Sequence, residues 1–235
     1  MRWLRHAALS FAAVAMLTGF LFWLWPLHFQ ARWDLLGEVL TERDPPEEWA
    51  NYSETISLKK PAVTQEYFPP HTLDPPTDQD EFWKAGISQY LASLAEPSVF
   101  ILRTRPEAQC YRLLWLRSFD PAISVRIDIE ADGSAQLTAT HSADHPSRRP
   151  TITRFTKRLA RWRASRLIRQ LEATGFWTMP AIVEDGGLDG SEWIFEGCRD
   201  GKYHVVKRWS PGNGPLKSFG LDLLEAAGFW RGPVY

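Results

Sequence analysis

Apolar and polar residues alternate with a period of two along residues 123–130. Alternation of this kind is typical of a strand with one buried face, and the apolar positions here are Ile123, Val125, Ile127 and Ile129. The turn residues 131–133 follow. A three-residue loop, with Gly133 in the left-handed position, sets Ile127 opposite Leu137 and keeps apolar side chains on one face. A two-residue loop would mix the two faces, so we predict a hairpin with the three-residue loop.

A second pair of alternating segments, residues 191–198 and 202–209, is joined by residues 199–201. The same test of face segregation again favours a three-residue loop. In that register one face is apolar and consists of Trp193, Phe195, Tyr203, Val205 and Trp209. The other face then carries two cross-strand pairs, Glu196 opposite His204 and Glu192 opposite Arg208.

The remaining apolar patterns predict one further strand and three helices. Residues 110–117 are mostly apolar and read as a strand, whereas residues 80–94, 155–172 and 216–227 carry apolar residues at helical spacing. Because short hairpins require antiparallel pairing, we predict an α+β domain. Its core would be an antiparallel sheet of about five strands, packed against helices on one face.

Residues 7–25 are 19 consecutive residues without a formal charge. At about 1.5 Å per residue they cross a hydrocarbon core of roughly 30 Å, so we predict an amino-terminal transmembrane helix. A cleaved signal peptide is the alternative, but cutting at the small-residue site at 13–15 would leave a strongly apolar terminus. Arg2 and Arg5 precede the segment and favour the cytoplasmic side. We expect a single-pass protein of the cytoplasmic membrane with its carboxyl-terminal domain in the periplasm.

Charge and proline divide the chain further. Residues 41–81 contain ten acidic and three basic residues together with seven prolines. Proline pairs disfavour helix and sheet, so this region reads as a semi-extended spacer. We predict a membrane anchor over residues 1–28, an acidic, proline-rich spacer over 29–80 and a globular domain over 81–235.

The quartet of the second hairpin is the candidate catalytic site. A carboxylate beside an imidazole can orient it and tune its pKa, so Glu196 and His204 are a candidate acid–base pair. Arg208 would hold an anionic substrate, with Glu192 beside it. Charged cross-strand pairs on a solvated hairpin face are the structural alternative. The chain lacks dinucleotide, phosphate-loop and zinc motifs, and we expect neither a cofactor nor a metal.

Cys110 and Cys198 are the two cysteines of the chain. In an oxidising compartment they could form a disulfide that closes a long loop. Two separate buried thiols are the alternative, and the sequence does not decide between them.

Residues 145–171 contain nine Lys and Arg residues and no acidic residue. Such a segment suits an anionic surface. The residues that we expect to bind an anion or a partner are Arg154, Lys157, Arg158, Arg161, Arg166 and Arg169. Outside the cytoplasm we expect no nucleic acid partner, which leaves anionic lipid headgroups of the membrane, an anionic envelope component, an acidic protein or the protein's own acidic spacer. A solvated helix face is the structural alternative.

Residues 189–197, 201–206 and 208–211 contain the combination Trp-x-x-Glu-Gly, Tyr-His and Arg-Trp-Ser-Pro. This combination resembles a family of bacterial envelope proteins of uncharacterised function. The resemblance implies a bacterial source and a shared hairpin core, and it brings no activity or cofactor. The layout of anchor, spacer and small α+β domain is also similar, in plan only, to energy-transducing proteins of the TonB type.

Three functions are therefore open. We expect a membrane-anchored extracytoplasmic binding or assembly module of the bacterial cell envelope without an assignable catalytic activity. The alternatives are an envelope enzyme that uses Glu196, His204 and Arg208, and a purely structural tethered spacer.

Overall fold

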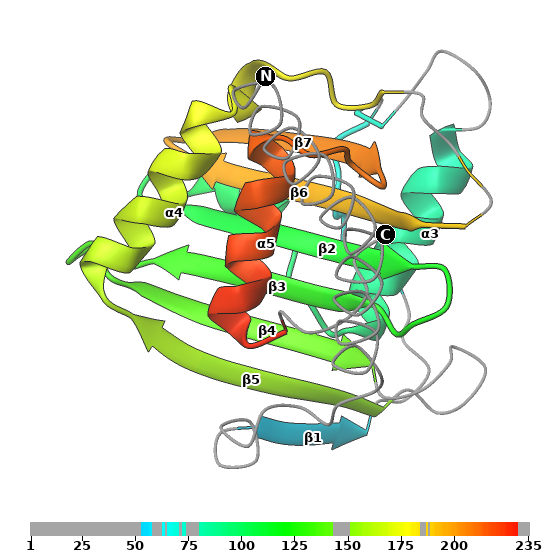
Figure 1. Cartoon of the computed structure of the whole chain (residues 1–235), viewed down its shortest axis with the longest axis horizontal. Coiled ribbons are helices and arrows are strands. Elements are labelled where there is room, and N and C mark those ends of the chain that lie inside the picture. Colours follow the sequence, from blue (N-terminus) through cyan, green and yellow to red (C-terminus); the bar gives the residue numbers. More distant parts are fainter. Residues whose placement is uncertain are drawn as a thin grey trace, which may run out of the picture. The chain divides into compact units, whose positions relative to one another are not determined.

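The computed structural model describes residues 53–57, 63, 65–70, 72–73, 80–142, 151–183, 187 and 189–229. In this part of the chain the strands form one antiparallel sheet of seven strands, in the order β1-β5-β4-β3-β2-β6-β7 (Figure 1). The strands are β1 (Ser53–Ser57), β2 (Cys110–Arg117), β3 (Ile123–Ile129), β4 (Ala135–Ser142), β5 (Thr151–Leu159), β6 (Ser191–Arg199) and β7 (Lys202–Trp209).

Helices cover both faces of this sheet (Figure 1). On one face, called here the α4/α5 face, lie α4 (Arg161–Ala173) and α5 (Pro215–Ala227). On the other, the α3 face, lies α3 (Asp80–Ser93). Neighbouring residues of β2 show the division, because Leu113 packs with α4 and α5 whereas Leu114 packs with α3. Two short 3₁₀ helices, η1 (Phe100–Thr104) and η2 (Phe176–Thr178), complete the described elements.

The fold-class prediction was wrong in three respects, although the antiparallel α+β character is present. The sheet has seven strands rather than about five, and it is covered on both faces rather than one. Among the residues that the structure describes, no helix has the length and apolarity that crossing a membrane requires. The predicted spanning segment, residues 7–25, lies outside the described residues.

Part of the predicted spacer belongs to the fold. β1 pairs along the whole of its length with β5, at one edge of the sheet. Tyr67, Phe68 and Leu73 are buried and join the core on the α3 face. These aromatic and leucine side chains of the predicted spacer cover apolar surface that the sheet would otherwise expose.

The predicted helix over residues 155–172 starts too early. Residues 151–159 form β5, which pairs with β4 on one side and β1 on the other. The helix begins only at Arg161, after Ala160 in extended conformation. The buried residues at helical spacing begin only at Ala164. Phe155 and Leu159 are four positions apart, a spacing that fits one face of a strand as well as one turn of a helix, and they belong to β5.

The first hairpin was predicted correctly. Ile127 lies opposite Leu137, and Val125 lies opposite Ala139. The backbone of Glu130 donates to the carbonyl of Ser134 at 2.8 Å, so residues 131–133 form the loop. Gly133 has a φ of 80°, the left-handed conformation that favours glycine at this position.

The second hairpin has a different register from the one predicted. Arg199 pairs with Lys202, so the loop is the two residues Asp200 and Gly201, both with positive φ. Such Asp-Gly loops match the right-handed twist of the strands. The prediction assumed that one face of the hairpin is apolar and the other is exposed to solvent. It failed because β6 is buried on both faces from Ser191 to Cys198.

Close approach of α5 to the sheet depends on a glycine. A Cβ atom at Gly220 would lie 2.4 Å from Cζ3 of Trp193, a buried residue of β6. Real Cβ atoms do not approach other heavy atoms so closely, so helix or indole would have to move. By contrast, a Cβ at Gly86 in α3 would meet nothing within 4 Å.

These two helical glycines give a matched pair of stability predictions. Gly220→Ala should lower the free energy of unfolding by about 1–3 kcal/mol through overpacking. Gly86→Ala should raise it by up to about 1 kcal/mol, because alanine is the better helix former and has room. Chemical denaturation of the purified variants measures both. An unchanged or increased stability of Gly220→Ala would contradict the tight contact with Trp193.

Candidate functional site

The observed hairpin register divides the predicted catalytic quartet between the two faces of the sheet. Glu196 lies opposite Val205, and Gly197 lies opposite His204. Because side chains alternate along a strand, Glu192 and Glu196 lie on the α3 face, whereas His204 and Arg208 lie on the α4/α5 face. The structure therefore does not bring Glu196 and His204 together, and the predicted acid–base pair is not formed.

His204 and Arg208 hold a segment of chain against β7. Nε2 of His204 lies 3.0 Å from the carbonyl oxygen of Met179, and the ring packs edge-on against Phe176. Arg208 donates from Nη2 to the carbonyl of Pro180 at 2.9 Å. Burial lowers the pKa of His204, although its bond to Met179 opposes the shift. The neutral imidazole that results suits a structural contact.

Glu196 belongs to a buried ion pair with a residue that the sequence analysis did not select. Arg112 lies directly opposite it on β2, and its Nε donates to Oε2 of Glu196 at 2.7 Å while its Nη2 donates to the same oxygen. The hydroxyl of Tyr203 donates to Oε1 at 2.9 Å. Both charged side chains are fully buried.

A second carboxylate, that of Glu96, extends this network. Arg112 lies 3.7 Å and Arg126 3.2 Å from Oε2 of Glu96, and Thr140 donates to Oε1 at 3.0 Å. Burial raises the pKa of Glu196, with Arg112 opposing the shift. Burial also disfavours the charge of Arg112, but Glu196 and Glu96 outweigh it and raise its pKa. We interpret the network as structural, because its charges are paired and hydrogen-bonded.

Neither Glu192 nor the surface hollow described below provides a catalytic site in place of the predicted pair. Glu192 pairs with Lys207 at 2.9 Å. An open hollow of about 550 Å³ lies between the end of β7 and the start of α5, lined in part by Arg208, Trp209 and Lys217. Neither Glu196 nor His204 lines it. Within the described part of the chain, no group of three or more His, Cys, Asp or Glu residues is arranged to hold a metal ion.

Cys110 and Cys198 are cross-strand neighbours. They lie directly opposite each other on β2 and β6, and both are buried beside Val99 on the α3 face. Both are free thiols in this structure. Burial raises the pKa of each thiol, strongly so for Cys110, where Asp128 adds to the effect. The thiols are adjacent but poorly reactive once the domain has folded.

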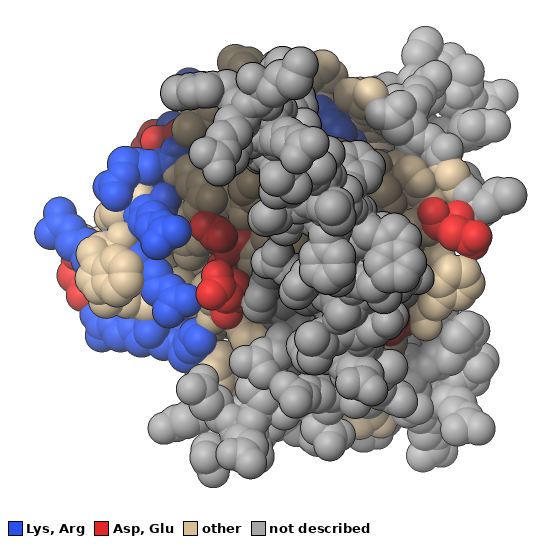
Figure 2. All heavy atoms as spheres, in the orientation of Figure 1, with Lys and Arg blue, Asp and Glu red and all other residues tan. Residues whose placement is uncertain are grey.

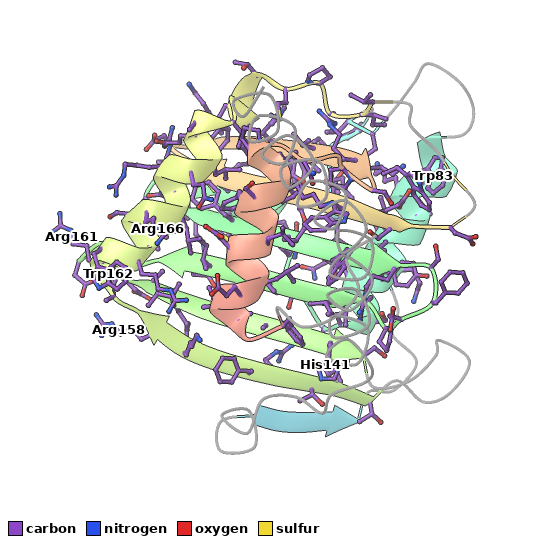
Figure 3. The ribbon with its side chains drawn as sticks, in the orientation of Figure 1. Trp83, His141, Arg158, Arg161, Trp162 and Arg166 are labelled. Atoms are coloured by element: carbon purple, nitrogen blue, oxygen red, sulfur yellow. The ribbon has the colours of Figure 1, made fainter. Side chains whose placement is uncertain are left out.

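The clearest exposed feature is a basic surface at the start of α4. We call it the α4 surface, and its members are Arg158, Arg161, Trp162, Arg166 and Arg169. Figure 2 shows Lys and Arg side chains gathered at this end of the molecule, and Figure 3 places Arg158, Arg161, Trp162 and Arg166 together where β5 ends and α4 begins. Four of the six basic residues predicted to bind an anion thus share one surface.

The other two predicted residues point to different places. Arg154 donates to the carbonyl of Ala95, on the α3 side of the sheet, at 3.1 Å. Lys157 lies over the ring of Phe155, 5.4 Å from its centre. Neither is needed to define the α4 surface.

Trp162 was missed by the sequence analysis and is 67% exposed. It lies four residues before Arg166 and seven before Arg169, so the three share one stripe of the helix. The available signal was a tryptophan at a polar position of an otherwise amphipathic helix, between two arginines.

Nearby acidic residues compensate this surface only in part. Asp132 lies 2.5 Å from Arg158, and Asp222 lies 3.7 Å from Arg166. All four side chains of these pairs are partly or largely exposed, and such pairs contribute little to stability. The first turn of α4 contains no acidic residue, although the helix dipole favours acidic residues there. Its arginines are therefore not explained by helix stability.

Comparison with known proteins adds no assignment: no family model matches the chain, and no curated protein is significantly similar to it.

We predict that the Arg112–Glu196 pair is needed for stability. Arg112→Met leaves a buried carboxylate without its main counterion and should lower the free energy of unfolding by about 3–5 kcal/mol. Arg112→Met combined with Glu196→Met should recover part of this loss, because no unpaired charge then remains at the pair. Denaturant titration checks both variants. The matched control is Arg105→Met at an exposed position, and an equal effect of Arg112→Met and this control would contradict the assignment.

We also predict that chain exported to an oxidising compartment contains a disulfide between Cys110 and Cys198. Directly opposed residues of antiparallel strands have Cα atoms about 4.5–5.5 Å apart, within the range of disulfides. Both thiols would lose their protons and pass two electrons to a disulfide oxidant, which is reduced to its dithiol. Because burial protects the thiols, the exchange should occur during folding.

Alkylation after complete unfolding, followed by mass spectrometry, tests this expectation. Exported protein should take up no alkyl group, whereas protein made in a reducing cytoplasm should take up two. A Cys110→Ser variant controls for the labelling of a single thiol. Two alkyl groups on the exported protein would refute the disulfide.

Proposed function

We propose that this chain is a membrane-attached binding module of the bacterial cell envelope, whose folded domain lies outside the cytoplasm and engages an anionic partner through the α4 surface. The observation that carries the proposal is the 67% exposed Trp162 among arginines whose side chains are largely exposed. In this proposal the chemistry of the domain is recognition, and its buried charges maintain the fold.

The proposed location rests on the amino-terminal sequence. Residues 7–25 carry no formal charge, and Arg2 and Arg5 precede them. Membrane proteins keep such positive residues on the cytoplasmic side. Residues that follow the apolar segment would then be exported, which includes the whole described domain from Ser53 onward.

The preference for binding over catalysis rests on how the titratable residues are used. Glu196 accepts hydrogen bonds from Arg112 and Tyr203. His204 lies on the opposite face, where its ring is hydrogen-bonded to the backbone of Met179. A general base needs a reachable proton at a site that substrate can enter. The enzyme alternative loses the one pair of residues on which it was based.

We predict that a photoreactive side chain at Ser165, on α4 between Trp162 and Arg169, captures an envelope component in intact cells. Charge reversal of Arg158, Arg161 and Arg166 to Glu should abolish these adducts, because the attraction to an anionic partner becomes repulsion. Electrophoresis and mass spectrometry of the adducts provide the measurement.

The matched control is the same photoreactive group at Phe119, which is 72% exposed in the loop between β2 and β3. That loop joins the opposite ends of the strands from the loop at 131–133, beside which the α4 surface lies. Equal capture at both positions, or capture unaffected by charge reversal, would refute the role of the α4 surface. A reporter enzyme that is active only outside the cytoplasm, fused after Tyr235, tests the location and would be inactive if the proposed orientation is wrong.

A further inference from the structure

The direction of β1 shows from which end the chain enters the sheet. Ser53 lies opposite Phe155, and Ser57 lies opposite Thr151. The start of β1 therefore faces toward the end of β5, where Arg158 and the first turn of α4 are located (Figures 1 and 3). The chain therefore enters β1 at the same end of the sheet as the α4 surface.

The length of that connection limits how far the domain can move from the segment that attaches it. Residues 26–52, which number 27, separate Trp25 from Ser53. A chain of this length spans at most about 95 Å even when fully extended. Tethering within such a distance raises the effective concentration of two binding partners, so a weak surface contact becomes populated.

The composition of the α4 surface suits the interface of a bilayer. An indole has an apolar body and a polar N–H, and tryptophan concentrates at the headgroup level of membranes. Guanidinium groups bind phosphate oxygens through paired hydrogen bonds. The surface charge of an anionic bilayer attracts basic residues that lie within about a Debye length of it. Tryptophan and arginine also anchor protein–protein interfaces, so the choice of the bilayer over an acidic protein rests on the tether, which keeps the 67% exposed indole and its arginines within reach of the membrane.

We infer that the anionic partner of the α4 surface is the phospholipid headgroup layer of the membrane to which the same chain is attached. This inference rests on the proposed function and names its partner. Trp162 inserts at the headgroup level, and Arg158, Arg161, Arg166 and Arg169 contact lipid phosphates around it. The domain then lies with the start of α4 against the bilayer and with the loop at 118–122 directed away from it.

The test uses the full chain reconstituted into vesicles of neutral phosphatidylcholine, with or without an equal amount of anionic phosphatidylglycerol. A fluorophore is attached at Ser165→Cys, since Cys110 and Cys198 are buried, and lipids that carry a quencher report its proximity to the bilayer. Quenching should increase severalfold in the anionic vesicles and return to the neutral level in high salt. Arg161→Glu combined with Arg166→Glu and Arg169→Glu should abolish the increase, and Trp162→Ala should reduce it.

A fluorophore at Phe119→Cys is the matched control and should show no increase. Circular dichroism confirms that the charge-reversed variant is folded, which the exposure of its three arginines favours. Equal quenching at Ser165 in neutral and anionic vesicles would overturn the inference. If cells then still gave protein adducts at Ser165 that depend on the arginines, the proposed function would stand with an acidic protein as partner. Loss of both signals would overturn the proposed function as well.

Discussion

The buried pair of Arg112 and Glu196 is the interaction on which the arrangement of the central strands depends. Each side chain is inaccessible to solvent, and each would carry a large desolvation cost without the other. Their contact requires that Glu196 lie on the same face of the sheet as Arg112 and directly across from it on β2. Once this is satisfied, alternation along β6 directs Trp193 and Phe195 toward α4 and α5.

The register of the second hairpin could not be predicted from its own residues, because β6 is buried on both faces and its charged side chains have partners outside the hairpin. Between β6 and β7 alone, the three-residue loop gives better segregation of apolar and charged side chains. Arg112, the main partner of Glu196, is 84 residues away in sequence. The hydroxyl of Tyr203 also bonds Glu196, so Tyr203 lies on the charged face and not with the aromatic residues of β6. A visible signal was present, since an arginine interrupts an otherwise apolar strand, but only the tertiary structure shows which carboxylate neutralises it. By contrast, the first hairpin depends on Gly133 and on alternation within a few residues, and local information was enough.

A similar distinction applies to the candidate site. The arginines that follow residue 157 could be selected from sequence because the absence of acidic neighbours is itself a local property. Their secondary structure could not, because β5 owes its extended form to hydrogen bonds with β4 and β1 on either side. Trp162 was overlooked because a tryptophan in an amphipathic helix is usually counted toward the core, and only its exposure reveals a different use.

The polar groups of this domain thus separate into two populations with different physical roles. Those on the α3 face are buried and compensated, and moving any one of them exposes an uncompensated charge to a medium of low dielectric constant. Those on the α4 surface are hydrated and loosely paired, so their charge can be redirected to a partner at small cost. A bilayer surface would suit the second population because it offers many phosphates without requiring a fixed geometry. β1 begins at the end of the sheet where β5 ends, so in the proposed arrangement the attachment of the domain and its recognition of the membrane would act at the same end of the sheet.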